Sequence, residues 1–275
     1  MEVLRDRVRF RIGSLECLVI SDGTVRLPGT HGPDDVRPNQ VDVMCLLIKT
    51  AEHMVLIDTG WGVGVGSEPN AGKLAQNLRA EGVQCAEIDT IILSHAHVDH
   101  IGGITDAEGN VVFPNARYFM NKKEWEYWAS DPDLTQLELP EESIRTGLMA
   151  AVRKNLMPIK DQIKLINGDT EIIPGIKLIW APGHTPGHIV PLISSGTEQL
   201  LCTGDLIHHP SELTRPELYR AYNMAPEQTI RTRTRLLSQV LTPNVLVFAC
   251  HFPFPGLGYI IQKGGVWSWQ PLEIE

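Results

Sequence analysis

The chain has 275 residues, of which 43% are hydrophobic, and 33 acidic against 24 basic side chains give a formal net charge of −9. A chain of this length can bury a substantial core without disulfide or metal staples. Its acidic balance disfavours broad binding to nucleic acid or an anionic membrane, because both require a basic surface. Ten histidines are the one unusual feature of the composition.

The first hundred residues consist of short β-branched runs separated by Gly, Asp and Asn, which predict a sheet. The expected strands are Leu15–Ser21, Val43–Lys49, Met54–Asp58 and Thr90–Ser94. Prolines and glycines between Val25 and Asp42 predict a long loop, and long loops in compact domains are often functional. A helix is predicted at Lys73–Glu81, ending near Gly82.

The middle of the chain loses the strand pattern, and we predict a helical insertion at residues 120–160, with helical character in Lys122–Ser130 and Pro140–Lys154. Strand patterns then return. The expected elements are strands Ile163–Ile166, Ile176–Ala181, Ile189–Ser194 and Leu200–Gly204, a helix at Pro226–Leu241 and a strand at Val245–Ala249. This order predicts an α/β (α+β) fold in which two sheet-plus-helix halves form one domain over residues 1–275.

Five cysteines, odd in number and without a CxxC pair, predict neither a disulfide framework nor a thiolate zinc site, so we expect them to be buried small side chains. Arg231, Arg233 and Arg235 are spread around their predicted helix, which favours a solvated face. The N-terminus is charged where a signal peptide is apolar, and no apolar stretch reaches the roughly 18 residues of a membrane span. We expect a soluble, cytoplasmic protein without a membrane partner.

Four side chains that commonly bind metals fall within six residues of the segment Ser94-His95-Ala96-His97-Val98-Asp99-His100. Alternate side chains of an extended segment share a face, so His95 and His97 can hold one metal together. Asp99 and His100 come where the chain begins to turn into a helix, and they can face a neighbouring position. An ordinary loop has no reason to gather three imidazoles and a carboxylate, so we interpret the cluster as a metal site.

Three further candidate ligands stand where apolar strands leave the core. His184 lies in the segment Ala181–His188, Asp205 ends the run Leu200–Asp205, and His251 follows a late strand. Loops at the rim of a sheet are where a rigid scaffold positions functional groups. Each residue alone is more typical of an ordinary polar strand end, but together with the cluster they favour a shared site.

In this order, HAHVDH, PGHTPGH, TGDLI and a late His before FPFPG resemble the metallo-β-lactamase superfamily, from about Val43 to Gly258. The resemblance implies a four-layer αββα sandwich with a dinuclear metal site between the loop edges of its sheets. The implied ligands are His95, His97 and His184 for the first metal, Asp99, His100 and His251 for the second, and Asp205 as the bridge. Asp58, in the Asp58-Thr59-Gly60 turn, would support the ligands without binding metal.

Ligand types narrow the choice within that superfamily. True β-lactamases of this type usually have Cys at the position of Asp205 and lack a metal-binding His at that of His100, so antibiotic hydrolysis is disfavoured. Flavodiiron oxidoreductases have Glu for the second His of the cluster, and the nucleases add a large domain or an RNA-grasping arm. Imidazole and carboxylate ligands suit zinc, and iron or manganese would also be compatible.

The pattern most resembles the group that contains the acyl-homoserine lactonases and methyl parathion hydrolase. We therefore expect a hydrolase of a small hydrophobic ester or lactone, in which a metal-bridging hydroxide attacks the carbonyl. Asp205 or a nearby imidazole would pass a proton to the leaving alkoxide, and the candidate catalytic residues are Asp99, Asp205 and His208. The lactonases carry Tyr where this chain has His208. A catalytic role for His208 and a role as a cap on the segment after Asp205 are equally consistent with the sequence.

Aromatic side chains near the motifs are candidates for an apolar substrate pocket, although core packing is an equal alternative for them. They are Trp61, Trp125, Trp128, Phe252 and Phe254. We expect His188 to support the ligands or pack against a strand. A phosphotriester or thioester hydrolase, or a metal-retaining sensor without turnover, remains an alternative function. We expect no nucleic-acid partner, and a homodimer is possible.

Overall fold

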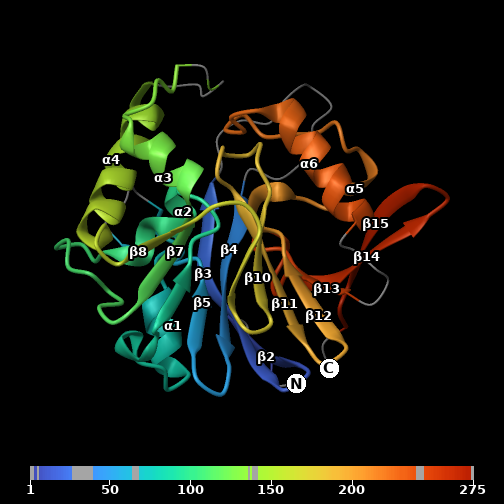
Figure 1. The fold of residues 1–275 in the computed structure, drawn as a ribbon, viewed down its shortest axis with the longest axis horizontal. Coiled ribbons are helices and arrows are strands. Elements are labelled where there is room, and N and C mark those ends of the chain that lie inside the picture. Colours follow the sequence, from blue (N-terminus) through green and yellow to red (C-terminus); the bar gives the residue numbers. More distant parts are fainter. Residues whose placement is uncertain are drawn as a thin grey trace.

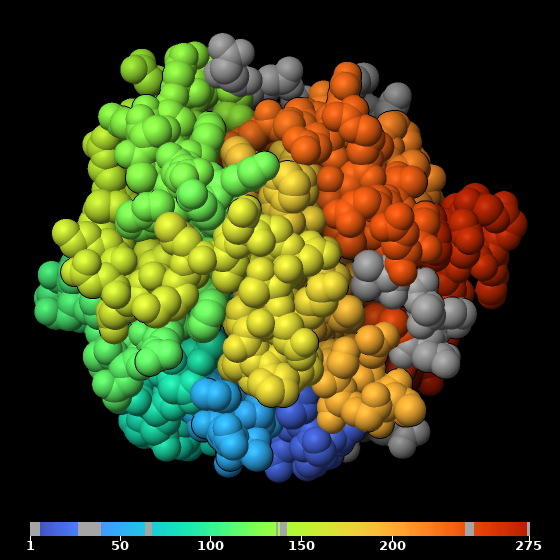
Figure 2. All heavy atoms as spheres, viewed as in Figure 1, coloured from blue at the N-terminus to red at the C-terminus, as the bar shows by residue number. Residues whose placement is uncertain are grey.

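The computed structural model describes residues 3–4, 6–26, 40–63, 68–135, 137, 142–239 and 245–273. Two sheets pack face to face, with helices outside each of them, so the layers run helices, sheet, sheet, helices (Figure 1). The predicted α/β fold and four-layer αββα sandwich are confirmed. In the space-filling view, the chain from β8 to β11 covers the middle of one face, between the helices of the first half and α6 (Figure 2).

The described residues form eight strands of the first sheet, in chain order. They are β1 (Val3–Leu4), β2 (Arg7–Ile12), β3 (Leu15–Arg26), β4 (Gln40–Lys49), β5 (Met54–Ile57), β6 (Thr90–Ile92), β7 (Arg117–Asn121) and β8 (Ile163–Ile166). Neighbours from β1 to β5 are antiparallel, and those from β5 to β8 are parallel. Parallel neighbours require crossover connections, which place the helices of this half on the outer face.

Three helical crossovers connect the parallel strands of the first sheet. They are α1 (Leu74–Ala80) with η1 (Cys85–Glu87) after β5, α2 (Val98–Ile101) with η2 (Gly102–Ile104) after β6, and α3 (Lys122–Ala129), α4 (Glu142–Leu156) and η3 (Met157–Ile159) after β7. The predicted helical segment of residues 120–160 thus contains these last helices, but its first two residues end β7. Pro140 lies outside the described residues.

The second sheet has the order β15-β14-β13-β12-β11-β10-β9. Its strands are β9 (Thr170–Ile173), β10 (Ile176–Trp180), β11 (Ile189–Ser195), β12 (Glu198–Cys202), β13 (Val245–Phe248), β14 (Leu257–Lys263) and β15 (Val266–Pro271). Within the described part of the chain, β12 and β13 are the one parallel pair of this sheet. Their connection contains η4 (Gly204–Leu206), α5 (Ser211–Thr214) and α6 (Pro226–Gln239).

The core lies in three layers that follow this architecture. A cluster between the sheets includes Leu46 and Val55 from the first sheet and Leu178 and Leu200 from the second. A second cluster packs under the helices of the first half, and a third lies between the second sheet and α6. Because the central strands are covered on both faces, they are nearly continuous apolar runs, which is why the sequence predicted them.

The predicted loop between Val25 and Asp42 was too long at both ends. β3 continues to Arg26 and β4 begins at Gln40, while residues 27–39 lie outside the described part of the chain. Val25, Val41 and Val43 pair across these strands and form a small buried cluster against Trp61. Burial of these valines overrides the turn preference of the nearby prolines and glycines.

Four of the five cysteines are buried as predicted, and Cys85 is partly exposed. Among the described residues, none of the helices combines the length and the apolarity that crossing a membrane requires. The assignment of residues 1–275 to a single domain stays a prediction.

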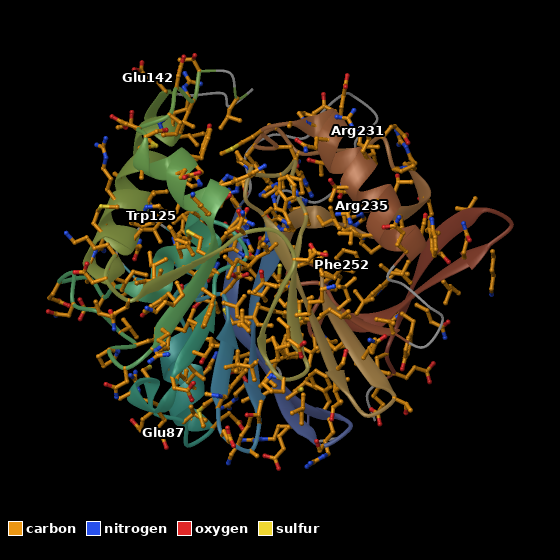
Figure 3. All side chains as sticks on the ribbon, viewed as in Figure 1. Glu87, Trp125, Glu142, Arg231, Arg235 and Phe252 are labelled. Atoms are coloured by element: carbon orange, nitrogen blue, oxygen red, sulfur yellow. The ribbon has the colours of Figure 1, made fainter. Side chains whose placement is uncertain are left out.

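The prediction of a solvated face for the α6 arginines was wrong for Arg233, which is 1% exposed. Its Nη2 lies 3.0 Å from Glu212 Oε2, and its Nε donates to the Leu206 carbonyl at 2.8 Å. Arg231 and Arg235 lie on the outer side of the helix (Figure 3). Arg233 therefore fixes α6 to the η4–α5 segment through a buried ion pair.

We predict that Arg233→Ala lowers the free energy of unfolding by about 3–5 kcal/mol, because it leaves the buried Glu212 carboxylate without its counter-charge. The control, Arg231→Ala, removes an exposed pair with Glu227 on the same helix and should change stability by about 0.5 kcal/mol or less. Urea denaturation of both variants measures the difference. Equal changes in the free energy of unfolding would show that the buried pair stabilises the fold no more than the exposed pair does.

Candidate metal centre

The candidate ligands lie in loops at one edge of the two sheets. His95 and His97 follow β6, while Asp99 and His100 lie in α2. The remaining ligands come from the second half: His184 between β10 and β11, Asp205 in η4 after β12, and His251 after β13. Strands that run in parallel end at the same edge, and the fold thereby brings these side chains from distant positions in the chain into contact.

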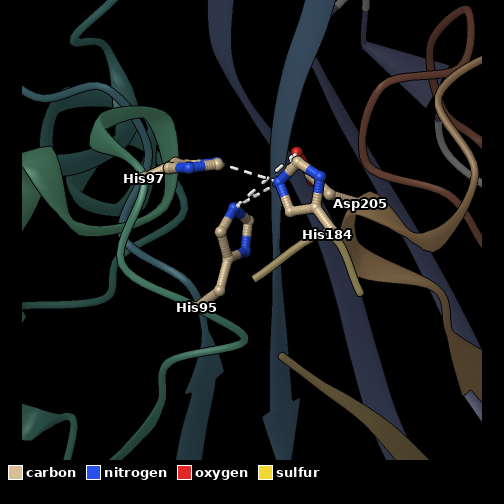
Figure 4. A group of neighbouring side chains, drawn as sticks. All are labelled: His95, His97, His184 and Asp205. Atoms are coloured by element: carbon tan, nitrogen blue, oxygen red, sulfur yellow. Dashed lines mark hydrogen bonds and ion pairs between the residues drawn. The ribbon is translucent and has the colours of Figure 1, made fainter. Parts of the chain in front are cut away.

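The first group contains His95, His97, His184 and Asp205, which converge on one point (Figure 4). His184 Nε2 lies 3.1 Å from His95 Nε2, 2.8 Å from His97 Nδ1 and 3.2 Å from Asp205 Oδ2. All four residues are buried. The separations are near the roughly 3.3 Å between ligand atoms that surround a tetrahedral zinc at about 2.05 Å.

The second group contains His100, Asp205, Cys250 and His251. Asp205 Oδ1 lies 2.9 Å from His100 Nε2 and 3.0 Å from His251 Nε2, and these two nitrogens are 3.3 Å apart. Asp99 Oδ2 stands 3.5 Å from His251 Nε2. Cys250, which the sequence did not suggest as a ligand, has its Sγ 4.0 Å from Asp205 Oδ1. Asp205 thus turns Oδ2 to the first group and Oδ1 to the second.

Asp58 supports the cluster from the turn after β5. Its Oδ1 accepts from the Ser94 N–H at 2.7 Å, and its Oδ2 accepts from Ser94 Oγ at 2.8 Å. The same Oδ2 lies 2.8 Å from His100 Nδ1, so the other ring nitrogen of His100 faces Asp205. Asp58 has a φ of +59°, an uncommon backbone conformation that aims the carboxylate at the ligand loop.

Two other ligands are held by groups that the sequence did not reveal. His251 Nδ1 lies 2.8 Å from the Asp42 carbonyl, and His184 Nδ1 lies 3.2 Å from Asn223 Oδ1. In each ring one nitrogen has a partner outside the centre, which fixes the orientation and leaves the other nitrogen facing inward.

His188 and His208 both contact the shared aspartate. His188 Nε2 accepts the Asp205 N–H at 3.0 Å, and a Cβ on Gly204, which has a φ of +49°, would lie 2.6 Å from this nitrogen. His208 Nε2 lies 3.0 Å from Asp205 Oδ2, and its ring stacks on that of His251 with 5.5 Å between centroids. His188 therefore positions the backbone of Asp205, and His208 contacts its carboxylate.

Burial decides the charge of the histidines in the first group, and nearby carboxylates decide that of His100 in the second. Burial lowers the pKa of His95, His97 and His184, so these rings are neutral and offer a lone pair. Burial alone would also lower the pKa of His100, but Asp205 and the other carboxylates nearby raise it well above its ordinary value. A cation that binds the second group would therefore displace protons.

Glu124, on α3, connects the two ligand loops, and no sequence pattern had indicated it. Its Oε1 accepts from the Ala96 N–H at 2.9 Å and Trp128 Nε1 at 2.8 Å. Its Oε2 accepts from Thr185 Oγ1 at 2.7 Å and the Gly187 N–H at 2.9 Å. A fully buried carboxylate with four donors thereby fixes the loop of His95 and His97 against the loop of His184.

The predicted pocket residues have different surroundings. Trp128 is buried with its ring 6.0 Å from that of His97, whereas Trp125 is partly buried against the core under the first sheet. Trp61 is partly buried beside the cluster of three valines described above. Phe254 packs against the cluster between the sheets.

Phe252 is buried in the core of the second half, and its assignment to the pocket stays a prediction. It is 1% exposed and packs on Trp269 with 4.9 Å between ring centroids. Figure 3 shows Trp125 and Phe252 in opposite halves of the molecule.

We predict that Glu124→Gln weakens zinc binding by about 10–100-fold, the usual cost of losing a group that orients metal ligands. The new amide NH2 would face two donors, so two of the four hydrogen bonds are lost. Competition with a chromophoric chelator measures the affinity. Glu126→Gln, an exposed change on the same helix, is the control, and an unchanged affinity in the Glu124 variant would refute the role.

Comparison with known proteins identifies the family to which the chain is similar. A model described as "Metallo-beta-lactamase superfamily" matches residues 38–251. An N-acyl homoserine lactonase of Bacillus thuringiensis is 28% identical over 229 residues, which are 76% of this chain and 80% of that protein. The N-acyl homoserine lactonase of Bacillus cereus is 27% identical over 170 residues, 56% of this chain and 58% of its own length.

Solved structures match over nearly the whole chain. AidC, described as a dizinc quorum-quenching lactonase in complex with a product, has a TM-score of 0.87 and 28% identity over 98% of both chains. The hydrolase AbOPH has a TM-score of 0.87 at 24% identity over 100% of both chains, a likeness of fold. The family model spans most of the chain and its resemblance is confirmed: the chain belongs to the metallo-beta-lactamase superfamily.

Proposed function

We propose that the protein is a dinuclear zinc hydrolase that opens a small hydrophobic ester or lactone. The observation that carries the proposal is the position of Asp205, which is shared between two groups of buried ligands. The coarser prediction, a metal-dependent hydrolase acting on ester bonds, is confirmed by relatives named lactonases and a dizinc lactonase of the same fold.

The donor set fits two divalent cations. His184 Nε2 carries either one proton or one lone pair, so its close contacts with His95 Nε2, His97 Nδ1 and Asp205 Oδ2 cannot all be full hydrogen bonds. We assign the first cation to His95, His97 and His184, and the second to Asp99, His100 and His251, with Asp205 between them. Imidazole and carboxylate ligands favour zinc, and iron or manganese is compatible with the same set.

When bound, two such cations supply a water of lowered pKa and polarise the carbonyl of an ester. The residues of this chain would then orient the substrate and move protons. Asp205, in contact with His208, is our candidate to pass a proton to the leaving alkoxide, and Asp99 is the second carboxylate at the site. Trp128 is buried beside His97, where it would support the apolar wall of the site from behind.

We predict that the zinc-loaded protein hydrolyses an N-acyl homoserine lactone with a kcat/KM above about 10⁴ M⁻¹s⁻¹, and faster than an aryl ester, a thioester or a phosphotriester. Relatives named for that activity motivate the order of preference. Steady-state kinetics on these four compounds test it.

The matched variants are Asp205→Asn and the exposed Asp169→Asn. Asp205→Asn should lower kcat/KM by more than the roughly 10–100-fold that removal of a residue supporting the metal ligands costs. Asp169→Asn should keep full activity. If the phosphotriester were the best substrate, the protein would be a phosphotriester hydrolase and the lactonase assignment would be wrong. Inactivity on all four compounds, with two zinc ions bound, would favour a metal-retaining sensor.

A further inference from the structure

Tyr222 holds a buried hydroxyl without a hydrogen-bond partner among the described residues. The residue lies between α5 and α6 and is 8% exposed. Its ring packs in the core cluster under the helices of the first half. A buried hydroxyl with no partner costs about 1–3 kcal/mol. Phenylalanine would pack in the same place without that cost, so packing does not explain the hydroxyl.

The ring of Tyr222 stands against the first ligand group. Its centroid lies 6.0 Å from that of His97, 5.8 Å from that of His184 and 5.6 Å from that of His208, all in edge-to-face arrangements. These imidazoles come from three different loops. The ring of Tyr222 therefore contacts side chains from three loops of the centre.

The backbone around Tyr222 is tied to the loop of His184. The N–H groups of Met224 and Ala225 donate to the carbonyls of His184 and Gly183 at 3.0 and 2.9 Å. The next residue, Asn223, contacts the ring of His184. Tyr222 thus has a fixed position relative to a candidate metal ligand, as a group that acts on a bound substrate requires.

We propose that Tyr222 is a catalytic residue whose hydroxyl donates a hydrogen bond to the carbonyl oxygen of the bound ester. The inference rests on the proposed function. No covalent bond forms to the phenol, and its proton stays on Tyr222 while negative charge develops on the substrate oxygen. In this proposal the hydroxyl, which lacks a partner in the free protein, gains one as the reaction proceeds, and a hydrogen bond that strengthens with the developing charge raises kcat.

The test is Tyr222→Phe, with Tyr118→Phe as the matched control. Tyr118 is fully buried on β7, and its hydroxyl donates to the Phe113 carbonyl at 3.1 Å. We expect Tyr222→Phe to lower kcat on the best substrate by about 100-fold or more with little change in KM. Its zinc content should equal that of the wild type, and its Tm without metal should be unchanged or higher. Tyr118→Phe should show the reverse, a lower Tm and normal kcat.

Two results would overturn the role of Tyr222. Wild-type kcat in Tyr222→Phe would refute it while leaving the proposed function intact. A lower kcat accompanied by loss of zinc or a lower Tm would show that the hydroxyl is structural. If the zinc-loaded wild type hydrolyses none of the four compounds, the proposed function and this inference both fail, so the two failures are distinguishable.

Discussion

The shared carboxylate of Asp205 is the interaction on which the rest of the centre depends. Burial alone would raise the pKa of this group, but His100 and the other surrounding imidazoles hold it well below its usual range. A buried anion is stable only when opposite charge and hydrogen bonds surround it. Asp205 is therefore both the point that joins the two ligand groups and the negative charge around which the histidines gather.

Other buried carboxylates hold the loops that carry the ligands. Glu124 joins the loop after β6 to the loop after β10, and Asp58 joins the turn after β5 to His100. Glu212, paired with Arg233, accepts the His208 N–H at 3.1 Å and so fixes the segment that follows Asp205. Each carboxylate is satisfied by several donors, and the loops therefore keep the ligands in place before a metal binds.

The candidate ligands could be identified in the sequence because their pattern is local: an HxHxDH cluster follows one strand, and single residues follow three others. No local pattern indicates Glu124, Tyr222 or Asn223. Each of them contacts the centre only because segments that are far apart in the sequence pack together in the fold. Arg233 was assigned to solvent because helical spacing alone does not reveal the buried partner that α5 supplies.

The missed strands have a simpler cause. The predicted strands were apolar runs, whereas β2 has the alternation of arginines and apolar residues that is typical of a half-buried strand. The hairpin of β14 and β15 did carry a turn signal, Gly264-Gly265, between alternating segments that pair from Gly258 to Lys263.

Zinc titration of the metal-free protein tests the shared dinuclear centre most directly. Lactone hydrolysis should be absent without metal, rise as zinc is added and reach its plateau at two equivalents per chain, because both groups converge on Asp205. Full activity in the metal-free protein, or a plateau at one equivalent, would contradict a reaction that depends on both ligand groups.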